Sequence, residues 1–226
     1  MAGPSSQTRS LHGGTNMLAI QSIHSQSWSQ GDSPMALSEI IAPDKSVAIW
    51  KRLTNPVIQN YFDTTFSSLG MGIRQMFELP SLKEALMRSL PDGEGKNEVV
   101  EDIYLLSDVL TCLFDCEGVG LRLVPLTAAM CPKFHTDQIP VRLVNTYLGQ
   151  GTEFLPVEEL LDEPVIGSKS SSKGAYHPHS IQQLDTHDVG LLKGSAWDKH
   201  EHMAAIHRSC KVANDEKRVL LTLDPI

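Results

Sequence analysis

The periodicity of the apolar residues changes at Gly118, and this change constrains the fold more than any other feature of the sequence. Before Gly118, apolar residues recur at a spacing of three and four in 57–66 and 99–113, which predicts amphipathic helices. After Gly118, short alternating or apolar stretches predict strands. These stretches are 119–124, 141–148, 189–192 and 218–223. The expected fold class is therefore α+β, with helices in the first half and a small β-sandwich or barrel in the second.

Two local signals predict where helices begin. Pro56 suits the first turn of a helix, because its φ is already fixed near the helical value and its missing N–H is not needed there. Ser81, with Glu84 three residues later, forms the pattern of a capping box. This pattern predicts a helix that opens at Ser81 and ends at the turn signal Pro91-Asp92-Gly93.

Residues 1–35 differ from the rest of the chain, since they contain eight Ser and four Gln but one basic and one acidic residue. Such a segment buries too little apolar surface to offset its ordering entropy, so we expect a disordered tail. The scarcity of acidic residues leaves an organelle transit peptide as the alternative. The expected organisation is a tail over 1–35, a helical part over 36–117 and a β part over 118–226.

The length of 226 residues fits one globular domain with an appendage. A formal net charge of −8 does not favour a polyanionic partner, so no nucleic acid is expected. Four scattered cysteines without a CxxC pair argue against a disulfide scaffold and favour a reducing compartment. No apolar run is long enough to span a membrane, and the start lacks a signal peptide. The chain is expected to be cytoplasmic, with no membrane partner.

His135 and Asp137 form the most specific chemical pattern. In an extended segment, residues i and i+2 point to the same side, so one imidazole and one carboxylate face one point. A distant histidine would complete a two-His-one-carboxylate triad, which leaves positions open on Fe(II). His207, 70 residues after Asp137, is the preferred third ligand, with His200 or His202 as alternatives. The competing interpretation is a loop in which Asp137 caps a turn and His135 is exposed.

A basic residue follows the third histidine at a defined distance. Arg218 lies eleven residues after His207 and opens the last apolar stretch, where an antiparallel neighbour would bring its guanidinium beside the metal. This order of residues resembles the Fe(II)/2-oxoglutarate-dependent oxygenases. The resemblance implies a double-stranded β-helix of the cupin type, a jelly roll with the helices as an N-terminal cap. It makes His135, Asp137 and His207 the catalytic iron ligands and Arg218 the partner of the distal 2-oxoglutarate carboxylate.

A second resemblance covers roughly residues 37–226. The stretches 48–50, 131–137, 142–149 with 151–155, and 207–209 are similar to the bacterial domain-of-unknown-function family eighteen twenty-six. This chain has Phe154 where that family tends to carry Trp, and Ser209-Cys210 where it tends to carry Ser-Pro. The resemblance implies a connection to metal homeostasis without naming the metal.

Several residues near these motifs are further candidates for binding the co-substrate or the metal. Arg142 is the second candidate for binding an anion, because a buried charge in a strand needs a partner. Asn145 and Tyr147 could hydrogen-bond a co-substrate from one strand face, although a core tyrosine is the commoner outcome. Cys131 is a possible soft ligand that would favour zinc. Six of the nine histidines lie in 177–207, which raises the same alternative.

The leading functional hypothesis is a non-haem Fe(II)/2-oxoglutarate-dependent oxygenase that hydroxylates a small molecule or a protein side chain. The polar loop 167–180 could act as a lid over its site. The rival hypothesis is a cupin-like zinc-binding protein without redox chemistry, which needs no anion partner at Arg218. A metal-free interaction module is the third.

Overall fold

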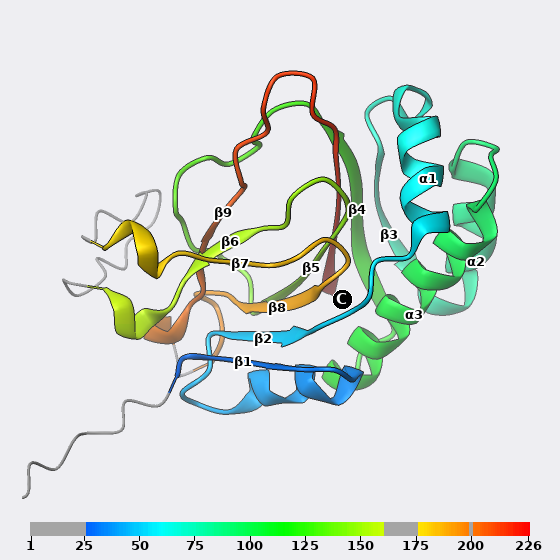
Figure 1. Cartoon of the computed structure of the whole chain (residues 1–226). Helices are drawn as coiled ribbons and strands as arrows, with labels where there is room; N and C mark the ends of the chain where they lie inside the picture. Colours follow the sequence, from blue (N-terminus) through cyan, green and yellow to red (C-terminus); the bar gives the residue numbers. More distant parts are fainter. Residues whose placement is uncertain (1–25, 161–175, 199–200) are drawn as a thin grey trace, which may run out of the picture.

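The computed structural model describes residues 26–160, 176–198 and 201–226. Two β-sheets face each other, and three α-helices gather on the outer side of the larger sheet (Figure 1). The expected mixture of helices and strands is therefore confirmed, and most of the strands belong to one large sheet.

The larger sheet has seven strands in the order β1-β2-β8-β5-β10-β4-β3. Its pairs are antiparallel except β1 with β2. The strands are Trp28–Gly31 (β1), Val47–Trp50 (β2), Ile73–Glu78 (β3), Gly118–Leu126 (β4), Val141–Leu148 (β5), Val189–Lys193 (β8) and Arg218–Pro225 (β10). The four stretches predicted as strands correspond to β4, β5, β8 and β10.

The smaller sheet has the order β7-β6-β9. Its strands are Glu153–Leu155 (β6), Gln182–Gln183 (β7) and Ile206–Arg208 (β9). An isolated antiparallel bridge between His135 and His207 adds the segment before β5 to the free side of β9. From β4 onward, the chain therefore passes repeatedly between the two sheets, with β6 and β7 as two consecutive strands of the small one.

The helices begin where the local sequence allows. Helix α1 (Pro56–Thr65) has Pro56 in its first turn and is capped by Asn55, whose side chain accepts hydrogen bonds from two backbone N–H groups. Helix α3 (Lys96–Phe114) carries the predicted apolar stripe. Helix α2 (Leu79–Ser89) begins earlier than the capping box predicted, because Pro80 already fits the first turn. Ser81 is therefore not the cap, and its hydroxyl donates to the Glu78 carbonyl.

The two faces of the large sheet have different roles because side chains alternate along each strand. One face packs against the helices and forms the main core with residues such as Leu121, Leu143 and Leu221. The other face packs against the small sheet at one end, where Val144 contacts Phe154 within a second apolar cluster. The residues between these apolar positions line the space between the sheets.

Two strands lie in segments for which the sequence predicted a different structure. Strand β1 falls inside the predicted tail, so the boundary at residue 35 is wrong for residues 28–31, which pair with β2 through the backbone. Strand β3 falls inside the predicted helical part and pairs with β4 at the edge of the sheet. Residues 1–25 and 161–175, the latter holding most of the predicted lid, lie outside the described residues. Among the described helices, none is long and apolar enough to cross a membrane.

Candidate metal centre

His135, Asp137 and His207 converge on one point. The Asp137 Oδ1 atom lies 3.7 Å from His135 Nε2, and Asp137 Oδ2 lies 3.5 Å from His207 Nε2. The ring centroids of the two histidines are 4.5 Å apart. One ligand atom from each residue lies within 4.8 Å of those of the other two. The spacing in the sequence therefore brings three metal-binding groups together, as predicted.

The backbone fixes both histidines in register. His135 and His207 exchange two backbone hydrogen bonds, of 3.0 and 2.9 Å, across the bridge that extends the small sheet. The Asp137 carbonyl accepts a 2.8 Å bond from the backbone N–H of Ser195, just after β8. Gly194 permits this approach, since a Cβ there would lie 1.8 Å from the Ile139 carbonyl oxygen.

Each histidine is oriented by a carbonyl two residues before it. His135 Nδ1 lies 3.0 Å from the Lys133 carbonyl oxygen, and His207 Nδ1 lies 3.0 Å from that of Ala205. A carbonyl can only accept, so each Nδ1 carries the proton and each Nε2 presents its lone pair toward Asp137. Carbonyls of this kind commonly orient metal-binding histidines. Burial lowers the pKa of His207, which favours the neutral ring that binds metals.

Arg142 holds the carboxylate of this group. Its Nη1 donates to Asp137 Oδ2 at 2.7 Å, while Nε and Nη2 donate to the two oxygens of Asp224 at 2.7 and 2.8 Å. Burial opposes the charge of Arg142, but the hydrogen bonds and charges of Asp224 and Asp137 outweigh burial and raise its pKa. The role of Arg142 in binding a co-substrate anion stays a prediction, and in this structure two carboxylates of the chain, those of Asp137 and Asp224, already pair with its guanidinium.

Arg218 has a different environment. Its side chain is 1% exposed, yet it contacts no carboxylate among the described residues. Its Nε donates to the Gln150 carbonyl at 2.7 Å and Nη1 to Ser209 Oγ at 2.7 Å. Nη2 donates to Thr146 Oγ1 at 3.3 Å and to Thr152 Oγ1 at 3.2 Å. Burial lowers the pKa of Arg218, and the negative charge of Glu153, which pairs with Arg208, offsets this effect only in part.

One pocket connects His135 and His207 with Arg218. It has a volume of about 100 Å³, and its walls include His135, His207, Cys131 and Arg218. The hydroxyl residues Thr152, Ser209 and Thr222 also line it. The Oγ1 atom of Thr222 is buried and has no hydrogen-bond partner among the described residues. A polar ligand in the pocket would satisfy this atom and balance the charge of Arg218.

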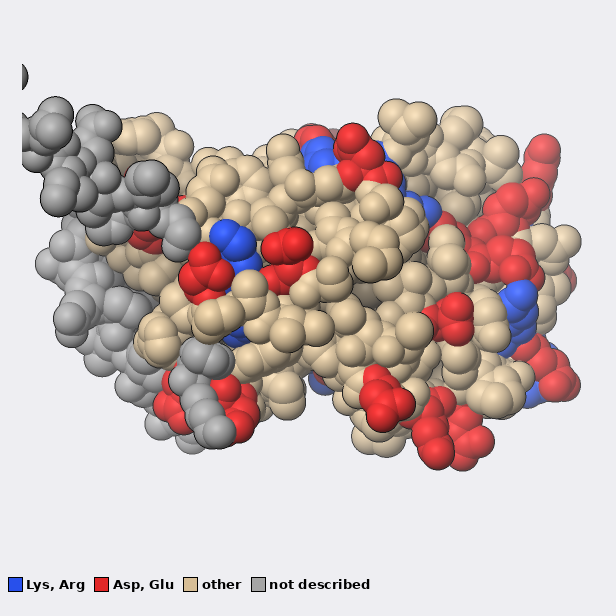
Figure 2. All heavy atoms as spheres, turned by 90° about the horizontal axis from the view of Figure 1, so that it is seen from below, with Lys and Arg blue, Asp and Glu red and all other residues tan. Residues whose placement is uncertain are grey.

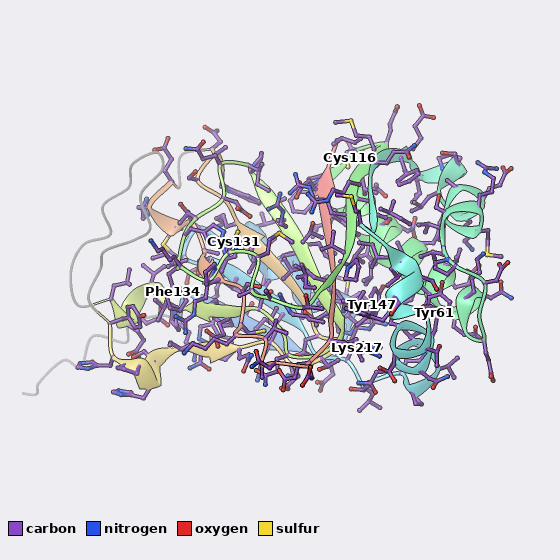
Figure 3. The ribbon with its side chains drawn as sticks, turned by 90° about the horizontal axis from the view of Figure 1, so that it is seen from above. Tyr61, Cys116, Cys131, Phe134, Tyr147 and Lys217 are labelled. Carbon is purple, nitrogen blue, oxygen red and sulfur yellow. The ribbon has the colours of Figure 1, made fainter. Side chains whose placement is uncertain are left out.

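Asn145 and Tyr147 do not line this pocket. Tyr147 donates to Asp102 of α3 at 2.7 Å, and Asn145 donates to the carbonyls of His187 and Asp188. In Figure 3, Tyr147 lies beside Tyr61 near the helices, on the far side of the strands from Cys131. Their role in binding a co-substrate stays a prediction, and in this structure the odd-numbered positions of β5, to which both belong, face the helices.

The other proposed ligands are placed as follows. Cys131 has a free, exposed thiol at the pocket wall but is not part of the three-residue metal group. His202 is also outside this group, and His200 lies outside the described residues. Thr146 contacts Arg218 although no sequence motif singles it out. Thr146 and Arg142 both occupy even-numbered positions of β5 and so share a face of the strand, which is the one signal in the sequence that points to Thr146.

The donor set fits a divalent transition metal. Metal–nitrogen and metal–oxygen bonds of about 2.1 Å separate neighbouring donors by roughly 3.0–3.4 Å. The donor atoms here are slightly farther apart, at 3.5 and 3.7 Å. Two imidazoles and one carboxylate also leave coordination positions open, which is typical of non-haem iron sites.

The family model described as "Protein of unknown function (DUF1826)" matches residues 31–224. The chain belongs to this DUF1826 family. No curated protein matches the DUF1826 sequence described here.

Solved structures with a similar arrangement include several oxygenases. A dioxygenase for auxin oxidation in rice is 13% identical, with 88% of this DUF1826 chain and 82% of that chain covered and a TM-score of 0.48. The non-heme alpha-ketoglutarate-dependent epimerase SnoN from nogalamycin biosynthesis is 13% identical, with coverage of 84% and 83% and a TM-score of 0.47. A prolyl 4-hydroxylase from Phytophthora capsici is 14% identical, with coverage of 85% and 62% and a TM-score of 0.46. At these low identities and scores, the function has to be inferred from the site residues of this chain.

Proposed function

We propose that this chain is a non-haem Fe(II)/2-oxoglutarate-dependent oxygenase that hydroxylates an organic substrate. The observation that carries the proposal is the buried guanidinium of Arg218, which shares a pocket with His135 and His207 and contacts no carboxylate of the described chain. A metal site alone does not require such a cation. A co-substrate with a metal-chelating end and a distal carboxylate does.

The topology is consistent with this proposal. From β4 to β10 the chain passes repeatedly between two facing sheets, although β6 and β7 are consecutive in one of them, and such crossings are expected for a double-stranded β-helix. His207 lies on β9, and Arg218 opens the next strand, β10. The chain order of His135, Asp137, His207 and then Arg218 is therefore the order that resembles the Fe(II)/2-oxoglutarate-dependent oxygenases. The three helices pack on the outside of the large sheet. The proposal includes the division into a helical cap over 36–117 and a metal-binding β part over 118–226.

Each residue would have a distinct role. His135, Asp137 and His207 would hold Fe(II), and Arg142 would keep the Asp137 carboxylate turned toward the two Nε2 atoms. Arg218, with the hydroxyls of Thr146, Thr152 and Ser209, would bind the distal carboxylate of 2-oxoglutarate through charge-assisted hydrogen bonds. When bound, Fe(II) and 2-oxoglutarate supply the oxidising chemistry that places an oxygen atom into a substrate C–H bond. The apolar residues Val144 and Leu220 would exclude water from the same pocket.

A zinc-binding protein without redox chemistry is the second candidate, favoured by one observation. The thiol of Cys131 lies at the wall of the same pocket and could approach a metal as a soft fourth ligand. That candidate leaves the buried charge of Arg218 without a role. It predicts tight zinc binding and no affinity for 2-oxoglutarate.

An anaerobic titration tests the proposal against this alternative. Fe(II) and then 2-oxoglutarate are added to metal-free protein while the visible metal-to-ligand charge-transfer band is recorded. The band is expected in wild type and absent in Asp137→Ala and Arg218→Ala, with Cys131→Ser retaining it. A folded wild-type protein that binds zinc tightly, depends on Cys131 and gives no band would overturn the proposal in favour of metal handling.

A further inference from the structure

Three polar residues form a row on the inner face of the large sheet. Arg74 of β3 lies opposite Arg122 of β4, and Arg122 lies opposite Thr222 of β10. All three line the pocket that contains His135 and His207. None of them has a role in the metal or 2-oxoglutarate contacts described above.

The two arginines carry uncompensated charges. Both are exposed, and within the described chain neither guanidinium forms a hydrogen bond or an ion pair. Like charges placed directly opposite each other on neighbouring strands destabilise a sheet. This contrasts with Arg142 and Arg208 of the same pocket, each of which is paired with a carboxylate. Packing of the sheet therefore does not account for the arrangement of Arg74 and Arg122.

Thr222 provides an independent observation at the same place. Its side chain is nine-tenths buried, it lines the pocket, and its Oγ1 atom has no partner among the described residues. A buried hydroxyl without a partner costs free energy that a bound ligand would recover. The row thus combines two unpaired cations with one unpaired hydroxyl, which together suit an anion with several acceptor oxygens.

The charge of this wall differs from that of the whole chain. The formal net charge is −8, and Figure 2 shows acidic side chains spread across the face of the molecule seen from below. A positive wall in a negatively charged protein favours an anion locally while the rest of the surface repels it.

We propose that Arg74, Arg122 and Thr222 form an anion subsite for the substrate, which is a small molecule carrying a carboxylate or phosphate group. This inference rests on the proposed function, because Arg218 is assigned to 2-oxoglutarate and the row is left for the substrate. The anion held by the row would place the rest of the substrate toward His135 and His207.

The test uses metal-free protein at low ionic strength and calorimetric titration with inorganic phosphate and, separately, with acetate. The variant Arg74→Gln/Arg122→Gln is compared with wild type. The matched control is Lys83→Gln/Arg88→Gln, which removes two positive charges from the exposed surface of α2. A third variant, Thr222→Val, removes the unpaired hydroxyl while keeping the side-chain shape.

Wild type is expected to bind at least one of the two anions, and stronger binding of phosphate or acetate identifies which group the substrate carries. Affinity is expected to fall at least tenfold in Arg74→Gln/Arg122→Gln and about threefold in Thr222→Val, and to change less than twofold in the α2 control. Without ligand, Arg74→Gln/Arg122→Gln is expected to melt at a higher temperature than wild type, because the repulsion is gone. An unchanged anion affinity in Arg74→Gln/Arg122→Gln, an equal loss in the control, or no binding by wild type overturns the inference.

A separate titration distinguishes this inference from the proposed function. The affinity of metal-loaded Arg74→Gln/Arg122→Gln for 2-oxoglutarate is expected to stay within threefold of wild type. If wild type fails to bind 2-oxoglutarate, the proposed function fails, whereas the phosphate and acetate titrations of metal-free protein still decide whether the anion subsite exists.

Discussion

Arg142 and Asp137 form a 2.7 Å ion pair, and the guanidinium of Arg142 also donates hydrogen bonds to both carboxylate oxygens of Asp224. The Asp137 carboxylate is thus tied to two strands, β5 and β10. In the proposed site Arg142 would act as a positioning residue, because it contacts the carboxylate that would bind the metal.

Replacing Arg142 by Gln is expected to weaken metal binding by about 10–100-fold, because residues that orient metal ligands typically have effects of this size. Asp224→Asn keeps the Arg142 guanidinium but weakens the hydrogen bonds that hold it, so the expected loss of metal affinity is smaller than in Arg142→Gln. Calorimetric titration with Zn(II) measures both, and circular dichroism checks the fold. Wild-type zinc affinity in folded Arg142→Gln would contradict the positioning role.

Arg218→Gln is expected to reduce 2-oxoglutarate affinity of the metal-loaded protein by roughly 100-fold, since truncating one partner of a buried charge pair commonly costs about 2–5 kcal/mol. Zinc affinity is expected to change less than threefold, because Arg218 contacts none of the three ligands. Arg218→Lys serves as the control that keeps the charge but not the fork of donors. Equal losses of zinc and 2-oxoglutarate affinity would indicate a purely structural role.

The stability of the metal-free protein is expected to decrease as the pH falls from about 7 to about 5. Burial lowers the pKa of His207, and burial also lowers the pKa of His187, whose Nε2 has no partner among the described residues. The unfolded histidine has a pKa near 6.5, so the unfolded chain takes up protons first. The stabilisation is therefore full above that value and is lost as the pH falls through the folded pKa.

Melting temperatures measured across this pH range test that expectation. His207→Gln and His187→Gln are each expected to have a smaller slope than wild type, and the double variant the smallest. A double variant with the wild-type slope would show that other groups control the pH dependence.

Tyr147→Phe is expected to destabilise the protein by about 1–3 kcal/mol, because the hydroxyl donates to the buried carboxylate of Asp102. The metal and 2-oxoglutarate affinities are expected to remain within twofold of wild type, since Tyr147 faces the helices. Urea denaturation and calorimetry measure the two quantities. A large loss of 2-oxoglutarate affinity without destabilisation would restore Tyr147 to the site.

The sequence alone predicts much of this fold where the signal is local. Apolar periodicity predicts α3, β4, β5 and β10, because each buries one face or both against a neighbour. Strand β3 carries mostly exposed side chains at the sheet edge, so it lacks the apolar pattern of a strand. Strand β1 is identified by its backbone pairing with β2, which its polar sequence does not encode.

The sequence also predicts part of the candidate metal site. The three metal-binding residues follow from the chemistry of their side chains and their order in the chain. Alternation shows which residues of β5 share a face, but not which face meets Arg218, so the sequence does not distinguish Asn145 from Thr146 as the contact of that guanidinium. The pairing of Arg142 with Asp224, 82 residues apart, depends on two strands meeting in the sheet, which local patterns do not specify.

The most direct test of the account is whether metal and 2-oxoglutarate bind to one shared site. The dissociation constant for 2-oxoglutarate is measured by anaerobic calorimetry with metal-free protein and with Fe(II)-loaded protein, in wild type and in Asp137→Ala. We expect at least tenfold tighter binding to the Fe(II)-loaded wild type and no such gain in Asp137→Ala. Equal affinity of the metal-free and Fe(II)-loaded wild type, or no binding to either, would contradict the account.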